Sequence, residues 1–222
     1  MLGLQNTKYI EGIHMFFYEG CTVLGQLPEH IINSVRDYVM GIDYTEDRFK
    51  RTEPALKYNS YIISVPPPYT MGAAYKFQNP TDIDFSKITP IIEELKTWPM
   101  FRNMTVFAAE VNYLLPDQAL LSHTDVRFYH LCGRRVQIPL LTDDSYFVSR
   151  DRPFKLTPPN VYEIDNISMH YANNKSKTTP KVSILIDWLD SSMIAEEEAA
   201  NRSVRRRVLY YSNTTPETDS YS

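Results

Sequence analysis

Alternating apolar and polar residues predict mainly β-strands in the second half of the chain. Between residues 104 and 190, short apolar-rich segments recur, and proline, aspartate and asparagine separate them. The expected strands cover residues 104–114, 119–123, 134–141, 145–149, 153–156, 160–164, 168–172 and 181–189. Short strands at this spacing are typical of a β-sandwich or β-barrel.

The first half of the chain combines two helical patterns with two short strand patterns. We expect strands at 15–25 and 61–65 and helices at 28–40 and 84–98. The second helix should begin near Ser86 or Thr89, with Pro90 in its first turn, where its missing N–H has no effect on hydrogen bonding. Two helices ahead of the strands can cover one face of a sheet.

The residues after 190 do not show the apolar pattern of a strand. Residues 191–211 are charged and are expected to be helical, and residues 212–222 are expected to form a disordered tail. We therefore expect one domain over residues 1–211, with the strands of 104–190 as its core.

Composition and charge exclude several classes of protein. The chain has 222 residues and a formal net charge of -4, whereas a general nucleic-acid-binding face usually makes the balance basic. The arginines at 202–207 follow the glutamates at 196–198, which favours a solvated helix face. No apolar stretch reaches the roughly 18 residues that cross a membrane. We expect no nucleic-acid partner and no membrane association.

Cysteine usage and the N-terminal residues point to a reducing compartment. The two cysteines show no zinc-binding spacing, and the first residues lack the basic and long apolar regions of a secretory signal. A cytoplasmic location is expected, and it would also suit a site for Fe(II).

His123, Asp125 and His170 are the candidate metal ligands. Residues at i and i+2 of a strand share a face, so His123 and Asp125 can reach one metal from the same side. A later strand of an antiparallel barrel can bring His170 beside them. Two imidazoles and one carboxylate are the ligands of non-haem Fe(II) oxygenases. The alternative is that the three are surface or capping residues.

Two further strands carry polar residues in apolar surroundings. Arg135 and Gln137 share one face of their strand, and such groups need either a polar partner or solvent. Lys181 opens the apolar strand VSILI, where a cation could hold a carboxylate or could be a plain surface lysine.

Taken together, residues 104–190 resemble the aspartyl/asparaginyl β-hydroxylase family of 2-oxoglutarate-dependent oxygenases. The segments that carry the resemblance are LLPDQALLSHTD, RRVQIPLLT, YEIDNISMHYANN and KVSILIDWLD. The resemblance implies a mainly β double-stranded β-helix, or jelly-roll, with flanking helices. It also implies Fe(II) as cofactor, 2-oxoglutarate and O2 as co-substrates, and succinate and CO2 as products.

The resemblance assigns iron binding to His123, Asp125 and His170, which would together be the catalytic centre. Asp125 supplies the carboxylate that many relatives have and some vertebrate members lack.

Four other residues fall at positions that bind the co-substrate in the family. Arg135 matches the strand arginine that meets the co-substrate, Gln137 stands where histidine is usual, and Asn112 stands where a small hydroxyl residue can lie. Lys181 falls where an arginine normally pairs with the far carboxylate of 2-oxoglutarate. Lysine lacks the bidentate geometry of arginine. Either Lys181 or Arg135 could therefore hold that carboxylate.

The implied activity is hydroxylation of a C–H bond in a protein, peptide or amino-acid side chain of the Asp/Asn type. A small-molecule 2-oxoglutarate oxygenase and a non-catalytic jelly-roll binding or structural module are the alternatives, and a zinc hydrolase is a weaker one. Small single-domain members of this kind resemble microbial and bacteriophage proteins. If the protein is viral, the expected cytoplasmic location is the cytoplasm of the host. The tyrosine-rich region 58–77 could be a lid over the substrate or an ordinary packed loop.

Overall fold

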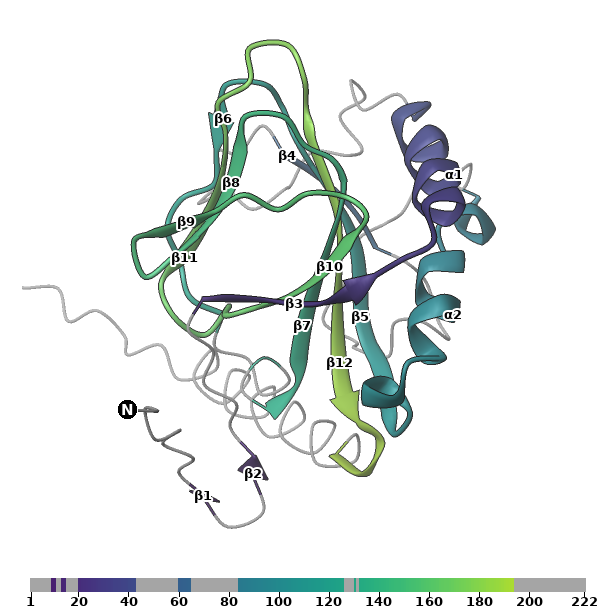
Figure 1. The fold of residues 1–222 in the computed structure, drawn as a ribbon. Helices are drawn as coiled ribbons and strands as arrows, with labels where there is room; N and C mark the ends of the chain where they lie inside the picture. Colours follow the sequence, from purple (N-terminus) through teal and green to yellow (C-terminus); the bar gives the residue numbers. More distant parts are fainter. Residues whose placement is uncertain are drawn as a thin grey trace, which may run out of the picture.

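A computed structural model of the chain describes residues 20–42, 84–125, 130 and 132–193, together with the backbone of three short strands at 9–10, 13–14 and 60–64. Two antiparallel sheets face each other across a barrel-like interior, and two helices pack on the outside of the larger sheet (Figure 1). The short pair β1 (Tyr9–Ile10) and β2 (Ile13–His14) forms a separate ribbon.

The larger sheet has six strands and carries most of the apolar core. In spatial order they are β3 (Cys21–Gln26), β10 (Asn160–Ile164), β7 (Arg134–Leu141), β12 (Lys181–Asp190), β5 (Met104–Leu114) and β4 (Ser60–Ser64). The smaller sheet has four strands, β6 (Gln118–Ala119), β11 (His170–Asn174), β8 (Ser145–Ser149) and β9 (Arg152–Phe154).

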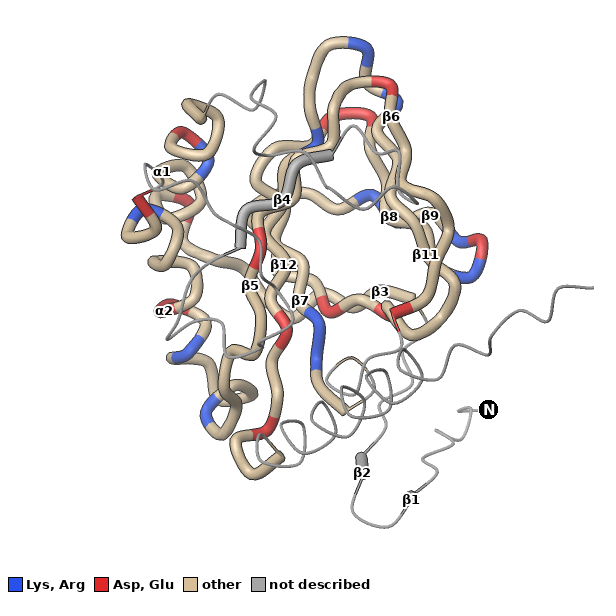
Figure 2. The backbone as a smooth tube through the Cα atoms, turned by 180° about the vertical axis from the view of Figure 1, so that it is seen from behind, with Lys and Arg blue, Asp and Glu red and all other residues tan. Residues whose placement is uncertain are grey.

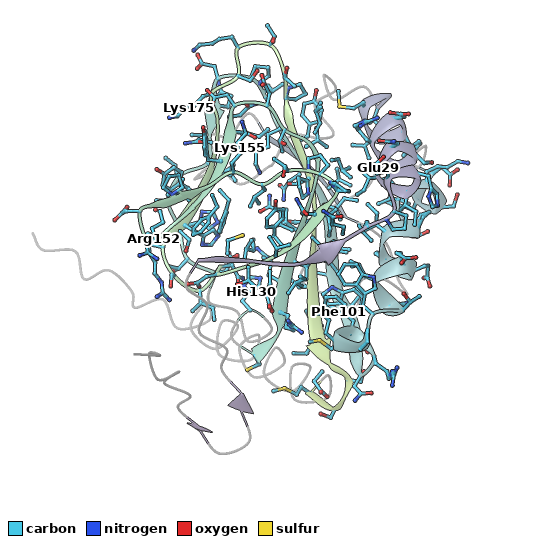
Figure 3. The ribbon with its side chains drawn as sticks, in the orientation of Figure 1. Glu29, Phe101, His130, Arg152, Lys155 and Lys175 are labelled. Atoms are coloured by element: carbon cyan, nitrogen blue, oxygen red, sulfur yellow. The ribbon has the colours of Figure 1, made fainter. Side chains whose placement is uncertain are left out.

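The helical segments lie together against the outer face of the larger sheet (Figure 1). They are α1 (Glu29–Met40), α2 (Pro90–Lys96) and the 3-10 turns η2 (Phe85–Lys87) and η3 (Pro99–Phe101). A further 3-10 turn, η4 (Ser191–Met193), follows β12. Phe101 lies in η3 (Figure 3), and its ring stacks on that of Trp188 in β12 with centroids 4.6 Å apart. No helix in the described part of the chain is long and apolar enough to span a membrane.

Strict alternation along β12 separates the apolar core from the barrel interior. Val182, Ile184 and Ile186 point toward the helices and belong to the large buried cluster. Lys181, Ser183 and Asp187 therefore share the opposite face, inside the barrel. The same alternation in β7 sends Val136 and Ile138 to the core and leaves Arg135 and Gln137 on the inner face. This alternation gives the interior of the barrel its polar side chains.

The expected fold class is confirmed, and several predicted elements have the observed bounds. Strands β5, β7, β8 and β10 cover the predicted residues, and β12 extends one residue further. The N-terminal strand predicted at 15–25 corresponds to β3, the one predicted at 61–65 to β4, and the one predicted at 153–156 to β9.

Three expectations were wrong in detail. The helix predicted over 84–98 is split into η2 and α2, because Asp84 caps the short turn and Pro90, without an N–H, begins a new helix. The strand predicted at 168–172 begins later, at His170, because the Asp165 side chain accepts the Ser168 N–H in a turn. The strand predicted at 119–123 is reduced to β6 and an isolated bridge at His123.

The expected helix at 191–211 beyond η4, the tail at 212–222 and the side chains of the tyrosine-rich region 58–77 lie outside the described residues. The extent of the domain stays a prediction.

Candidate metal centre

His123 and His170 are held opposite each other by their own backbones. The His123 N–H donates to the His170 carbonyl at 3.0 Å, and the His170 N–H donates to the His123 carbonyl at 2.9 Å. Their rings lie with centroids 4.4 Å apart. The pairing predicted from a returning strand is therefore present as an isolated antiparallel bridge, and this bridge brings the two imidazoles together.

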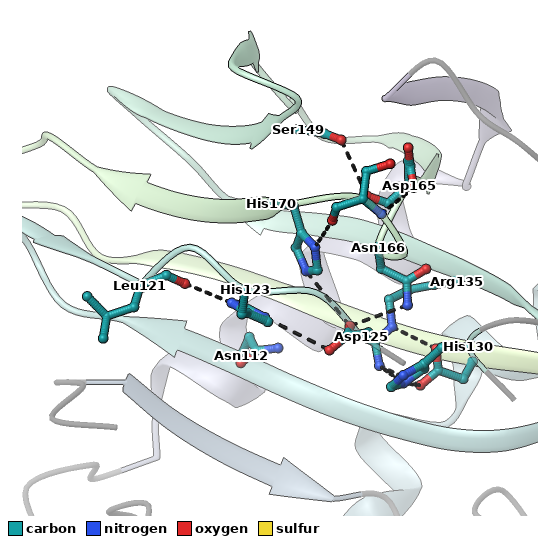
Figure 4. Close-up of polar contacts among 12 residues, drawn as sticks. Asn112, Leu121, His123, Asp125, His130, Arg135, Ser149, Asp165, Asn166 and His170 are labelled. Carbon is teal, nitrogen blue, oxygen red and sulfur yellow. Dashed lines mark hydrogen bonds and ion pairs between the residues drawn. The ribbon is translucent and has the colours of Figure 1, made fainter. Parts of the chain in front are cut away.

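Backbone carbonyls also fix which nitrogen each imidazole presents. His123 Nδ1 lies 2.7 Å from the Leu121 carbonyl, and His170 Nδ1 lies 2.9 Å from the Ser168 carbonyl (Figure 4). A carbonyl oxygen only accepts, so each Nδ1 carries the hydrogen and each neutral ring keeps a lone pair on Nε2. Burial is the main cause that lowers the pKa of His170, which favours the neutral form that metals bind.

Asp125 completes the group between the two rings. Its Oδ1 lies 4.0 Å from His123 Nε2, and its Oδ2 lies 3.8 Å from His170 Nε2. Burial is the largest influence and disfavours its charge, but the positive charge of Arg135 together with the charges of His130, His170 and His123 in their protonated forms outweighs it and lowers the pKa of Asp125 to about 2. The side chain is therefore an ionised carboxylate at neutral pH.

The three side chains fit a divalent metal ion. One ligand atom from each of His123, Asp125 and His170 lies within 4.8 Å of the others. Two neutral imidazoles and one carboxylate are a donor set suited to Fe(II), with the remaining positions open to other ligands. The side chain of His123 is 41% exposed while that of His170 is 7% exposed, so the group opens to solvent on the His123 side.

Arg135 lies directly behind the carboxylate. Its Nη1 donates to Asp125 Oδ2 at 2.6 Å, and its Nε and Nη2 donate to the two oxygens of Asp187 at 2.7 and 2.8 Å. The predicted polar partner of Arg135 is thus a pair of acids inside the barrel, and the alternative of a solvated outer face is excluded by its burial. The tube coloured by charge shows the basic stretch of β7 among acidic positions of neighbouring strands (Figure 2).

Gln137 and Asn112 also lie on inner faces of the larger sheet. Gln137 is buried and donates to the Ser183 hydroxyl at 3.1 Å, and Asn112 donates to Glu110 at 3.1 Å. Asn112 and Ser183 are opposite each other in the register of β5 and β12. These groups form a polar lining along the interior.

Lys181 is buried at the start of β12, on the same inner face as Ser183. Only 5% of the residue is exposed, and burial lowers the pKa of its ammonium to about 8. Within the described parts of the chain, its ammonium makes no hydrogen bond or ion pair that would offset this desolvation. A buried ammonium of this kind is complementary to an anionic ligand.

Three further residues surround the candidate metal ligands: Asp187 and Asn166, which sequence reasoning missed, and His130, which it interpreted as structural or at most as lining the mouth of the site. Asp187 pairs with Arg135, Asn166 donates to Asp125 Oδ2 at 3.3 Å, and His130 Nε2 lies 2.9 Å from Arg135 Nη2. Figure 3 places His130 on the barrel side of the larger sheet, away from the helices. The acid within the apolar strand KVSILIDWLD was the one available signal, because its spacing puts Asp187 on the same face as Lys181 and Ser183.

The comparison with solved structures bears on the fold. An oxidoreductase of the 2OG-Fe(II) oxygenase family from Burkholderia pseudomallei matches with a TM-score of 0.52 and 12% identity, over 77% of this chain and 84% of that one. The chain has a double-stranded β-helix fold. No protein-family model matches it, and no curated protein sequence does either.

Two prolyl hydroxylases are also among the structural neighbours of this jelly-roll. A prolyl hydroxylase from Trichoplax adhaerens, in complex with a peptide fragment of hypoxia inducible factor, has a TM-score of 0.49 at 12% identity over 82% of this chain and 86% of that one. The viral collagen prolyl hydroxylase of Paramecium Bursaria Chlorella virus-1 has a TM-score of 0.46 at 10% identity over 77% of this chain and 95% of that one.

Proposed function

We propose that this protein is an Fe(II)- and 2-oxoglutarate-dependent oxygenase that hydroxylates a C–H bond. The observation that carries the proposal is the convergence of His123, Asp125 and His170 at one end of a barrel whose interior also holds the buried ammonium of Lys181. A metal site alone fits many activities. A keto-acid co-substrate needs both a metal site and a buried cation, here the Lys181 ammonium, that can pair with its carboxylate.

In this proposal the three ligands hold the iron and the barrel interior orients the co-substrate. Bound Fe(II) and 2-oxoglutarate would supply the oxidising chemistry that inserts an oxygen atom from O2 into a C–H bond and releases succinate and CO2. The carbonyls of Leu121 and Ser168 keep Nε2 of both histidines directed at the metal. The barrel walls exclude water from the co-substrate.

We propose Lys181, rather than Arg135, as the group that binds the far carboxylate of 2-oxoglutarate. Three nitrogens of Arg135 already donate to Asp125 and Asp187, whereas the Lys181 ammonium is buried without such partners among the described residues. Ser183 lies on the same face two residues later and offers a hydroxyl beside that cation. Gln137 and Asn112 would line the path between metal and cation.

The substrate class proposed first is an aspartyl or asparaginyl side chain in a peptide, a protein or a free amino acid. The sequence resemblance of the metal-binding segments supports this choice, and the peptide complex of the Trichoplax adhaerens enzyme makes peptides a natural first screen. A cytoplasmic location would keep the iron reduced. If the substrate is a small molecule, the same screen should detect succinate production but no hydroxylated peptide.

Anaerobic binding of Fe(II) and 2-oxoglutarate tests the proposal directly. We expect a weak visible absorption band from wild-type protein and no band from His170→Ala, since that variant lacks a ligand. His30→Ala is the matched control, because His30 is exposed on α1 outside the barrel, and it should keep the band. If the wild-type protein binds no metal and gives no band, the chain is a non-catalytic jelly-roll module.

The pH dependence of 2-oxoglutarate binding tests the role of Lys181. Its pKa is lowered to about 8 by burial, and only the ammonium form attracts a carboxylate. Apparent affinity should therefore be constant below pH 8 and fall by up to about tenfold per pH unit above it. Calorimetric titration with Mn(II)-loaded protein between pH 7 and 9 measures this. Lys181→Arg should give a flat profile, since arginine stays charged throughout; an equally steep profile in that variant would exclude Lys181 as the titrating group.

A further inference from the structure

A buried chain of charged side chains crosses the barrel and ends on a metal ligand. Asp187 of β12 and Arg135 of β7 are opposite each other in the sheet register, and the guanidinium binds both oxygens of Asp187. The remaining terminal nitrogen of the guanidinium reaches Asp125 Oδ2 at 2.6 Å (Figure 4). Among the described residues, Asp187 makes no contact with His123, Asp125 or His170 and reaches Asp125 through Arg135; its other polar neighbour is His130, whose Nε2 lies 3.9 Å from Asp187 Oδ2.

The burial of this chain makes its geometry stiff. The side chains of Asp187 and Arg135 are 6% and 8% exposed, so neither can exchange its partner for water without a large desolvation penalty. Bidentate pairing fixes the plane of the guanidinium and therefore the direction of the N–H that reaches Asp125. Apolar side chains of similar size would often stabilise such a position as well as an ion pair does, so stability alone gives no reason for these charges.

The two carboxylate oxygens of Asp125 have different contacts. Arg135 and Asn166 both donate to Oδ2, which also lies 3.8 Å from His170 Nε2. Oδ1 lies 4.0 Å from His123 Nε2 and accepts no hydrogen bond from a described residue. The carboxylate is thereby fixed through Oδ2, with one of its oxygens near each imidazole. Charge supports the same view, because two carboxylates share one guanidinium and the group as a whole attracts a cation.

We propose that Asp187 and Arg135 are a positioning pair that orients Asp125 for metal binding. The inference rests on the proposed metal-binding role of His123, Asp125 and His170. Asp187 fixes the position of Arg135, and Arg135 fixes the carboxylate of Asp125 so that one oxygen lies near each imidazole. Residues that orient metal ligands in this way typically change metal affinity by 10–100-fold when they are replaced.

The neighbouring pair Arg134–Glu163 provides a matched control on the opposite face of β7. Arg134 Nε and Nη2 donate to the two oxygens of Glu163 at 2.6 and 2.7 Å, and the Glu163 side chain is as buried as that of Asp187. The donor atoms and distances are similar to those of the Arg135–Asp187 pair, but in the described part of the chain neither residue contacts His123, Asp125 or His170. Loss of this second pair should affect folding stability without reaching the metal.

Mn(II) binding to the full chain, measured by electron paramagnetic resonance without co-substrate, tests the proposal. Asp187→Asn keeps the size of the side chain but removes its charge and one acceptor, and we expect metal affinity to fall about 10–100-fold. The visible spectrum of the Co(II)-substituted variant should also shift, because the carboxylate ligand is no longer fixed. Glu163→Gln should bind Mn(II) within about twofold of wild type, whatever its loss of thermal stability.

A second variant keeps the test informative if Asp187→Asn fails to fold. Arg135→Lys keeps the positive charge but cannot bind Asp187 and Asp125 at once, so it should weaken Mn(II) binding in the same direction. Unchanged affinity and an unchanged Co(II) spectrum in a folded Asp187→Asn protein would overturn the positioning role while leaving the proposed oxygenase intact. An equal loss of Mn(II) affinity in Glu163→Gln would show that the effect of Asp187→Asn comes from a general loss of folding stability. A wild-type protein that binds no Mn(II) would reject both proposals.

Discussion

Replacing Lys181 with methionine is expected to remove 2-oxoglutarate binding and, at the same time, to stabilise the protein without ligand. Only 5% of Lys181 is exposed, and within the described chain nothing offsets the desolvation of its charge. Methionine has a similar length and no charge. Apparent affinity for 2-oxoglutarate should fall by about 100-fold or more.

The gain in stability follows from the direction of the pKa shift. The pKa of Lys181 is lowered from 10.5 to about 8, so between these values the unfolded chain binds more protons than the folded one. Stability of the ligand-free wild type should therefore rise with pH across that window, and Lys181→Met should gain about 1–3 kcal/mol at pH 7. Urea unfolding measures this.

The exposed Lys177 offers the matched control for both effects. It pairs with Asp117 on the surface, with 74% of its side chain exposed. Lys177→Met should leave 2-oxoglutarate affinity and the free energy of unfolding within about 0.5 kcal/mol of wild type. Unchanged 2-oxoglutarate affinity in Lys181→Met would instead make Arg135 the carboxylate-binding group.

Replacing Asp125 with alanine is expected to abolish metal binding under conditions where wild type is saturated. The variant loses a ligand and also frees the Arg135 nitrogen that held it. We expect metal affinity to fall by more than about 100-fold, beyond what loss of an orienting residue causes. The free energy of unfolding should fall by about 1–3 kcal/mol, because Arg135 keeps Asp187 as a partner.

The stability difference between wild type and Asp125→Ala should depend on pH. The pKa of Asp125 is lowered from 3.8 to about 2, so its contribution is complete above about pH 4 and is lost as the pH falls toward 2. Metal titration calorimetry and urea unfolding at pH 7 and pH 3 measure both effects. Asp37→Ala, at an exposed aspartate of α1, should change neither; metal binding retained by Asp125→Ala would remove Asp125 from the ligand set.

Local patterns were sufficient for the strands with strict alternation and for selecting the three residues that converge. Apolar residues at every second position identified β5, β7 and β12, and His-x-Asp identified two of the three candidate ligands that lie together. Elements defined by side-chain turns were less predictable. The turn made by Asp165 delays the start of β11, and nothing in the spacing of apolar residues reports that hydrogen bond.

The partners of Arg135 could not be derived from sequence because they depend on sheet register. Arg135 and Asp187 lie 52 positions apart and meet only because β7 and β12 are adjacent with this one alignment. A shift by one residue would send either side chain to the opposite face. The same register places the ammonium of Lys181 inside the barrel, where the sequence left open a surface position.

The reciprocal backbone hydrogen bonds between His123 and His170 have a consequence for metal exchange. Because the reciprocal peptide hydrogen bonds hold the two imidazoles with ring centroids 4.4 Å apart, the backbone sets the spacing of the histidines. If the proposed iron site forms, folding and metallation are therefore expected to be separable events: a chelator should strip the protein, and a later addition of iron should restore it without a denatured intermediate. The proposed oxygenase would then be open to iron loading after its synthesis.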